Sequence, residues 1–209
     1  MKYRKHLLVT ATAFLLAIGG LGCSSGNPSN NGNNGNLPPS PPAGPGGVPN
    51  QTEINNGVIV FAGAEGIGEQ IHANPPTDCN AMDALLSAIK IDCDNPPDGT
   101  GSVVTLNNCS ASGSVLTQTV SVNFNNCLQG NITQTGDATV VISFDSSNGN
   151  NPVSMTVSSD IMNVDGFTFA TNDFAIIETE DPNPGSSACL GTLVYNNTSC
   201  DVVDCASCD

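Results

Sequence analysis

The chain has 209 residues, nine cysteines, no tryptophan and a formal net charge of −15. Three of its four basic residues precede Cys23 and all 19 acidic residues follow it, so the part beyond Cys23 has Lys90 as its only Lys or Arg and a formal charge of −18. Nucleic acids and anionic lipid surfaces attract proteins through Lys and Arg, so we expect neither as a partner. The acidity itself fits solubility, adaptation to salt, or binding of divalent cations between carboxylates.

The first 22 residues have the features of a signal peptide. Lys2, Arg4 and Lys5 form a basic start, and residues 7–18 (LLVTATAFLLAI) are apolar. This apolar run is shorter than the roughly 20 residues that a membrane-spanning helix needs. The pattern therefore predicts export and removal of residues 1–22.

The segment Gly20-Leu21-Gly22-Cys23 resembles the lipobox of bacterial lipoproteins. The resemblance implies that Cys23 is diacylated and becomes the N-terminus, so that the membrane is a partner through the lipid. The usual lipobox has Leu at the position of Gly20, and here it is Leu21. Ser24, rather than Asp, implies transfer to the outer membrane or cell surface. The alternative is ordinary cleavage after Gly22, which leaves Cys23 as a thiol. Lipidation has the advantage that eight cysteines, an even number, remain for disulfides.

We expect residues 23–52 to consist of a lipidated cysteine followed by a disordered linker. From Ser24 to Thr52 the chain consists almost wholly of Ser, Gly, Asn and Pro, with too few apolar residues for a core. As a flexible coil it would have an end-to-end distance of about 30 Å. Residues 53–209 then form a single domain of ordinary size.

A glycine-rich stretch and one helix are expected at the start of this domain. Gly63, Gly66 and Gly68 lack the spacing of a nucleotide-binding loop, so we interpret them as a turn and expect no nucleotide. Asn80 can cap a short helix whose apolar residues recur at three- and four-residue spacing. These residues are Met82, Leu85, Leu86 and Ile89.

From Ser102 onward, apolar and polar residues alternate as in half-buried strands. The apolar positions are Val120, Val122 and Phe124; Ala138, Val140, Ile142 and Phe144; Val153, Met155 and Val157; Phe167 and Phe169; Phe174 and Ile176; and Leu193 and Tyr195. Turns are expected at 135–137, 147–151, 165–166 and 172–173. Thr135–Ile142 resembles Thr171–Glu178, a weak internal repeat. The fold class is all-β: an antiparallel meander forming a sandwich or a curved sheet (half-barrel), with one short helix and disulfide stabilisation.

Eight cysteines are disulfide candidates: Cys79, Cys93, Cys109, Cys127, Cys189, Cys200, Cys205 and Cys208. The sequence does not fix the pairing among the 105 possibilities. It favours a Cys79–Cys93 bond across the predicted helix and a Cys109–Cys127 bond at a sheet edge, the latter between residues that are not directly opposite in a simple hairpin. The last four cysteines are expected to attach the C-terminal tail to the domain. An exported chain favours disulfides over a thiol-redox or zinc site at Cys205 and Cys208, although that alternative stays open.

Carboxylate pairs are the one catalytic arrangement that the composition allows. The candidates are Glu65 with Glu69 and Glu178 with Glu180. Two such groups, one with a raised pKa, can hydrolyse glycosidic bonds. His72 is the only histidine beyond Cys23, and without a nucleophile motif it is interpreted as a loop residue.

The only cofactor that the sequence suggests is calcium. Asp160, Asn163 and Asp165 offer oxygen ligands before Gly166, but Ile161 and Met162 break the spacing of a calcium loop. We therefore assign no metal ligands and treat the three residues as weak calcium candidates.

Nothing in the sequence identifies a specific activity. The favoured interpretation is an envelope or surface lipoprotein without catalytic residues, a binding or structural module for another envelope or extracellular component. The competing hypothesis is a secreted carboxylate-dependent hydrolase, for example of polysaccharide. Two acids that come together, one of them with a shifted pKa, would favour the hydrolase, whereas scattered and exposed acids would favour the binding module.

Overall fold

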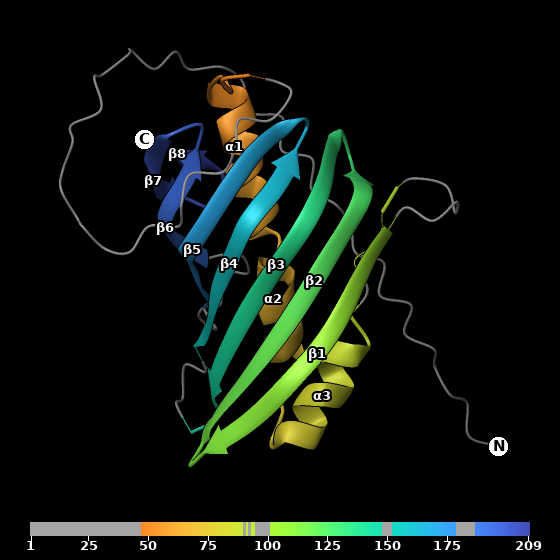
Figure 1. Ribbon diagram of the computed structural model, residues 1–209. Helices are drawn as coiled ribbons and strands as arrows, with labels where there is room; N and C mark the ends of the chain where they lie inside the picture. The colour runs from red at the N-terminus through yellow and green to blue at the C-terminus, as the bar shows by residue number, and fades with distance from the viewer. Residues whose placement is uncertain (1–46, 90, 92, 95–100, 148–151, 179–186) are drawn as a thin grey trace. The chain divides into compact units, whose positions relative to one another are not determined.

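The computed structural model describes residues 47–89, 91, 93–94, 101–147, 152–178 and 187–209 (Figure 1). The predicted signal peptide, Cys23 and most of the predicted linker lie outside these ranges. Lys90 and Glu180 also lie outside them.

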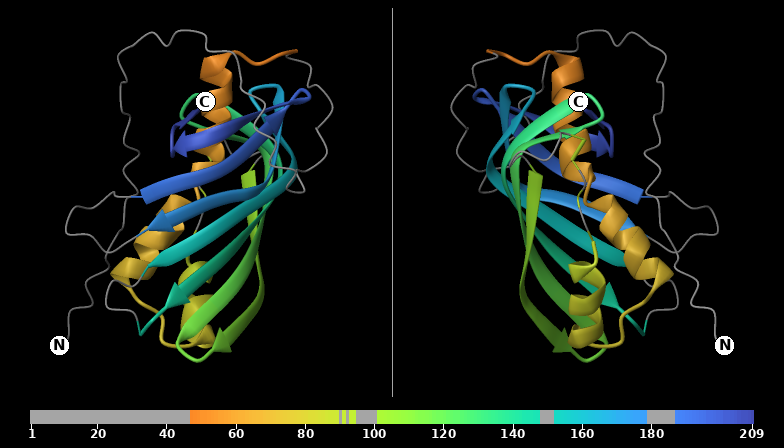
Figure 2. Two further views of the ribbon diagram at one scale, coloured as in Figure 1. Left: turned by 90° about the vertical axis from the view of Figure 1, so that its left-hand side faces the viewer. Right: turned by 90° about the vertical axis from the view of Figure 1, so that its right-hand side faces the viewer.

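In the described part of the chain, eight strands form one antiparallel sheet in which each strand pairs with its sequence neighbours. They are β1 (Gly101–Ser112), β2 (Val115–Gln129), β3 (Ile132–Asp145), β4 (Val153–Val164), β5 (Phe167–Glu178), β6 (Ser187–Tyr195), β7 (Thr198–Asp204) and β8 (Ser207–Cys208). The predicted meander is confirmed. These eight strands make one sheet, which curls around the helices (Figure 2), so the curved-sheet alternative is correct for the described residues and the sandwich is not.

The alternating residues identify the core face of the sheet correctly. Val120, Ile142 and Met155 are each at most 2% exposed, whereas Val141, on the other face, is 38% exposed. Each fully buried aliphatic or aromatic side chain contributes about 1.5–3 kcal/mol. The core is therefore built from one face of the sheet and the helices packed on it.

Two of the predicted turns lie inside strands, one opposite a β-bulge and one at a β-bulge. Gly136 lies within β3, and the extra residue of the β3–β4 register shift belongs to β4, where Ser159, Asp160 and Ile161 lie opposite Asp137 and Ala138. Asn172 and Asp173 lie within β5, where the register with β6 shifts between Ala170 and Ala175. A bulge changes which face the side chains point to and interrupts the alternation, as a turn does in the sequence. The turn at Asp165-Gly166 is confirmed.

The described residues form three helices, so the expectation of one helix is wrong. They are α1 (Gln51–Ala62), α2 (Glu65–Ala73) and α3 (Cys79–Ser87). Helix α1 begins at Gln51, so the last two residues of the predicted linker are helical. Asn50 caps α1, because its side chain accepts from the Thr52 and Glu53 amides while the Glu53 carboxylate accepts from the Asn50 amide.

Two details of the helix predictions are also wrong. Gly66 and Gly68 lie inside α2, and only Gly63 lies in the turn between helices. Asp78, rather than Asn80, caps α3, with its carboxylate 2.8 Å from the Ala81 amide nitrogen.

All three helices lie on one face of the sheet (Figures 1 and 2). Helix α1 packs on β4, β5, β6 and β8, α2 on β4 and β5, and α3 on β1. Gly57 lets α1 approach closely, because a Cβ there would lie 3.1 Å from the Phe169 ring and 3.2 Å from Leu193. The opposite face, called the outer face below, is not covered by these helices.

The described residues contain four disulfides, and neither of the pairings favoured for the first half of the domain is present. The bonds are Cys79–Cys109, Cys93–Cys127, Cys189–Cys205 and Cys200–Cys208. As predicted, the last four cysteines bind the C-terminal tail. Disulfides of this number indicate an extracytoplasmic protein.

Strand register explains the corrected pairings. Cys109 pairs with Gln118 near one end of the β1–β2 hairpin, whereas Cys127 lies beyond Asn125, which pairs with Gly101 at the other end. Nine residues of strand span about 30 Å, far beyond the reach of a disulfide. Cys79, the first residue of α3, and Cys93, beyond its end, therefore each bond to a different end of the hairpin.

Candidate functional site

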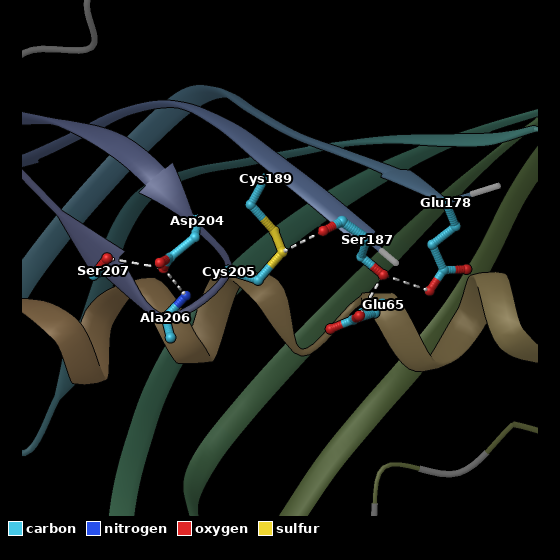
Figure 3. Close-up of a disulfide and its surroundings, with 8 residues drawn as sticks. All are labelled: Glu65, Glu178, Ser187, Cys189, Asp204, Cys205, Ala206 and Ser207. Carbon is cyan, nitrogen blue, oxygen red and sulfur yellow. Dashed lines mark hydrogen bonds between the residues drawn. A yellow bond between two sulfur atoms is a disulfide. The ribbon is translucent and has the colours of Figure 1, made fainter. Parts of the chain in front are cut away.

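The end of β5, the start of β6 and the start of α2 bring two carboxyl groups together around one hydroxyl (Figure 3). Glu178, the last residue of β5, pairs in the sheet with Ser187, the first residue of β6. Glu65 is the first residue of α2. We call Glu65, Glu178 and Ser187 the carboxyl cluster.

The Ser187 hydroxyl links the two acids. Its Oγ donates a hydrogen bond to Glu65 Oε1 and lies 3.4 Å from Glu178 Oε1. Glu178 is only 4% exposed, and among the described residues its Oε2 has no hydrogen-bond partner. Glu65 is half-buried and Glu69, one turn further along α2, is exposed.

Burial raises the pKa of Glu178 from its ordinary value of 4.5 to about 8, with further contributions from the negative charges of Glu65 and Glu69. Burial disfavours the charged form of a carboxyl group, and nearby carboxylates act in the same direction. The hydrogen bond to Ser187 opposes these effects but is smaller. At neutral pH, Glu178 is therefore mainly the uncharged acid.

Gly68 explains why α2 lies directly on this acid. A Cβ at Gly68 would overlap the Glu178 carboxyl group, whereas nothing lies within 4 Å of a Cβ at Gly66. The missing side chain thus leaves the space that the carboxyl group fills.

The carboxyl cluster combines one member of each predicted pair. Glu65 and Glu69 share a helix, but Glu65 meets Glu178 across the fold, and Glu180 lies outside the described residues. Ser187 and Gly68 were missed. Gly68, three positions after Glu65, is the one sequence signal for a close contact between α2 and the sheet at this point.

The calcium candidates shape turns and a surface depression. Asp165 accepts from the Thr133 amide at 2.8 Å and from Asn56 Nδ2 at 3.2 Å, and Asn163 Oδ1 accepts from the Gly166 amide at 3.0 Å. Asp160 lines a depression of about 330 Å³ on the outer side of β3 and β4. Its other lining residues are Asp137, Thr139, Ser158, Ser159 and Ile161. Across the described ranges, no three His, Cys, Asp or Glu side chains are arranged to hold a metal ion.

The other candidates have structural positions. His72 lies in α2 rather than in a loop, and neither of its ring nitrogens has a hydrogen-bond partner among the described residues. Cys205 and Cys208 are bonded to Cys189 and Cys200, so neither carries a free thiol for redox or zinc chemistry. The Cys205 sulfur lies 3.9 Å from the Ser187 carbonyl oxygen, beside the carboxyl cluster (Figure 3).

Beside the Cys189–Cys205 bond, Asp204 closes the tight turn of the C-terminal tail. Its Oδ1 accepts from the Ala206 amide and the Ser207 hydroxyl, both at 2.8 Å. The Ala206 amide in particular lowers the pKa of Asp204. This acid therefore stays ionised as part of the turn.

The outer face contains a continuous uncharged area. Strand pairing aligns three cross-strand rows of Thr, Ser and aliphatic residues. The rows are Thr105–Ser121–Thr139–Ser158, Thr119–Val141–Thr156–Ala175–Leu190 and Thr117–Ser143–Ser154–Ile177–Ala188. We call them the hydroxyl rows. No acidic residue occurs in them, although the chain has 19.

No helix within the described ranges has the length and apolar character required to cross a membrane. Comparison of the chain with protein-family models, with curated proteins and with solved structures finds no match.

Proposed function

We propose that the chain is a lipid-anchored, non-catalytic module that binds an uncharged, hydroxyl-bearing polymer through the hydroxyl rows. The observation that carries the proposal is the lack of charge in these rows in a protein that is otherwise strongly acidic. Covering a charged group without a partner is costly, so a face that repeatedly contacts another surface is best built without charges.

The chemistry of the rows favours a neutral polysaccharide over other partners. Ser and Thr hydroxyls both donate and accept hydrogen bonds, as sugar hydroxyls do. Val141, Ile177 and Leu190 are 38%, 38% and 52% exposed and add apolar contacts between the hydroxyls. The net charge of the chain opposes anionic polymers.

A carboxylate-dependent hydrolase is the second candidate, favoured by the meeting of Glu65 with Glu178 and by the raised pKa of Glu178. Two carboxyl groups with different pKa values are the pattern that glycoside hydrolysis uses. The near-complete burial of Glu178 beneath α2 weighs against this candidate, because a catalytic acid must reach its substrate.

Cosedimentation with insoluble cellulose and chitin as neutral probes tests the binding function. We expect binding that persists at high salt, since screening weakens only charge–charge attraction. Thr156→Asp, in the middle of the rows, should weaken binding about tenfold, equivalent to about 1.4 kcal/mol. Thr198→Asp, at the exposed start of β7, is the matched control and should bind as the unmodified protein does.

Absence of binding to either probe, or equal binding by both Asp variants, contradicts the proposal. Reducing sugar ends are measured in the same samples. Their release by the unmodified protein, lost in Glu65→Gln, would establish the hydrolase instead.

The lipid anchor is tested separately by the intact mass of membrane-extracted protein. We expect loss of residues 1–22 and added acyl groups on Cys23, as the lipobox-like segment implies. Alkylation should label no cysteine before reduction and eight after it, because the eight remaining cysteines form four disulfides. An unlipidated Cys23 that is alkylated without reduction contradicts the anchor.

A further inference from the structure

We propose that Glu178, Ser187 and Glu65 form a protonation-dependent latch that holds α2 against the ends of β5 and β6. The latch joins a buried acid on the sheet to the first turn of the helix through a single hydroxyl. Gly68 brings the helix into direct contact with the same acid.

The Ser187 hydroxyl has only one hydrogen to donate, and this determines which protonation state of Glu178 the latch favours. The contact of the hydroxyl with Glu65 is much shorter than its 3.4 Å contact with Glu178, so it donates mainly to Glu65 and only weakly to Glu178. When Glu178 is protonated, its own O–H donates to Ser187 Oγ, and the chain of hydrogen bonds from Glu178 through Ser187 to Glu65 is complete. When the proton leaves to solvent, the buried Glu178 carboxylate keeps only the long 3.4 Å contact with Ser187 as a donor, and its Oε2 has no hydrogen-bond partner among the described residues.

The groups that face Glu178 all disfavour its ionised form or are neutral. Helix α2 presents the Glu65 and Glu69 carboxylates, β6 presents the Ser187 hydroxyl, and on β4 the paired residue is Val153. No cation is among the groups that shift the pKa of Glu178. Ionisation therefore places a buried negative charge on Glu178 near the carboxyl groups of the half-buried Glu65 and the exposed Glu69.

Helix α2 is the element that such repulsion can release. It has nine residues and no side-chain cap at its N-terminus, and only Gly68 and Ile71 are buried within it. Helix α3, by contrast, begins at the Cys79–Cys109 disulfide. Helix α1 has five buried residues and a capping box.

The sign of the pH dependence follows from the raised pKa. With α2 in place, Glu178 holds its proton up to about pH 8, and when α2 moves away the pKa returns toward 4.5. The closed state thus binds more protons between these values, and its advantage over the open state falls as pH rises from about 4.5 to about 8. Above that window, both states are ionised and the balance no longer changes.

Hydrogen exchange of the α2 amides in the full domain tests the latch. After correction for intrinsic exchange rates, protection of these amides should fall on the order of a hundredfold between pH 5 and pH 8. The α3 amides serve as an internal reference and should change far less. Glu178→Gln keeps a neutral side chain at every pH, so its α2 protection should stay nearly constant.

Two glycine variants on the same helix test the geometry. Gly68→Ala should lower α2 protection about tenfold already at pH 5, since the added methyl group displaces the carboxyl group or the helix. Gly66→Ala, which points into open space, should leave α2 protection unchanged or raised. Constant α2 protection in the unmodified protein, an equal pH-dependent loss in Glu178→Gln, or equal behaviour of the two Ala variants would overturn the proposal.

Discussion

Replacing Cys93 and Cys127 by Ala is expected to lower the free energy of unfolding by about 4 kcal/mol, against about 2.5 kcal/mol for replacing Cys200 and Cys208. The first bond joins residues 34 positions apart and the second joins residues 8 apart. A longer closed loop removes more conformational freedom from the unfolded chain, so its loss is more destabilising.

Urea unfolding followed by circular dichroism measures the difference between the two double variants. Each variant retains three disulfides, which thiol quantification under denaturing conditions verifies. A larger loss for the Cys200–Cys208 variant would contradict the expectation and show that native contacts of the tail outweigh loop length.

The strands could be predicted because one face of the sheet is buried and the other is not. In β3, for example, Val140 and Ile142 face the core and Val141 faces outward. Period two is a direct consequence of strand geometry, so this signal needs no knowledge of neighbouring strands. The bulges could not be predicted, since a local break in the pattern looks like a turn until the pairing on both sides is known.

Helices α1 and α2 were missed because their sequences favour other structures. The second half of α1 contains a run that is typical of a strand, Val58-Ile59-Val60-Phe61. Gly66 and Gly68 disfavour a helix by about 1 kcal/mol each relative to Ala. Packing against the sheet outweighs these local preferences, as Gly57 beside Phe169 illustrates.

The carboxyl cluster could be predicted only in part. The sequence identifies Glu65 and Glu178 as acids of interest, but their partners depend on register and on a helix that local propensity does not predict. Ser187 faces Glu178 only because β5 and β6 pair in one particular register. The same dependence on register applies to the hydroxyl rows, which bring together residues from six strands.

Two β-bulges, each facing a glycine on the neighbouring strand, contribute to the curvature of the sheet. Gly136 on β3 and Gly191 on β6 both have φ values in the left-handed half of the map, +142° and +129°. Each lies against the backbone of a bulged neighbour, Ile161 and Asp173 respectively. Bulges increase local twist and bend the strand, so this repeated arrangement contributes to the curl of the sheet. Of the two segments of the weak internal repeat, the one from Thr135 contains Gly136, opposite the β4 bulge, and the one from Thr171 contains the bulged Asp173.

Gly136→Ala is expected to lower the free energy of unfolding by about 3 kcal/mol or more. The positive φ costs a non-glycine residue about 1–3 kcal/mol, and the overlap adds a comparable amount. The new Cβ would lie 2.5 Å from the Ile161 carbonyl oxygen and 3.1 Å from Met162 Cα, both backbone atoms that cannot move independently.

Gly113→Ala is the matched control, because Gly113 also has a positive φ, +62°, but nothing lies within 4 Å of its added Cβ. Its loss should be limited to the conformational term, about 1–2 kcal/mol. Urea unfolding of both variants separates strain from overlap, and equal losses would contradict the close contact at the bulge. Since Gly136 precedes Asp137, which lines the outer depression, Gly136→Ala should also alter that depression while Gly113→Ala leaves it intact.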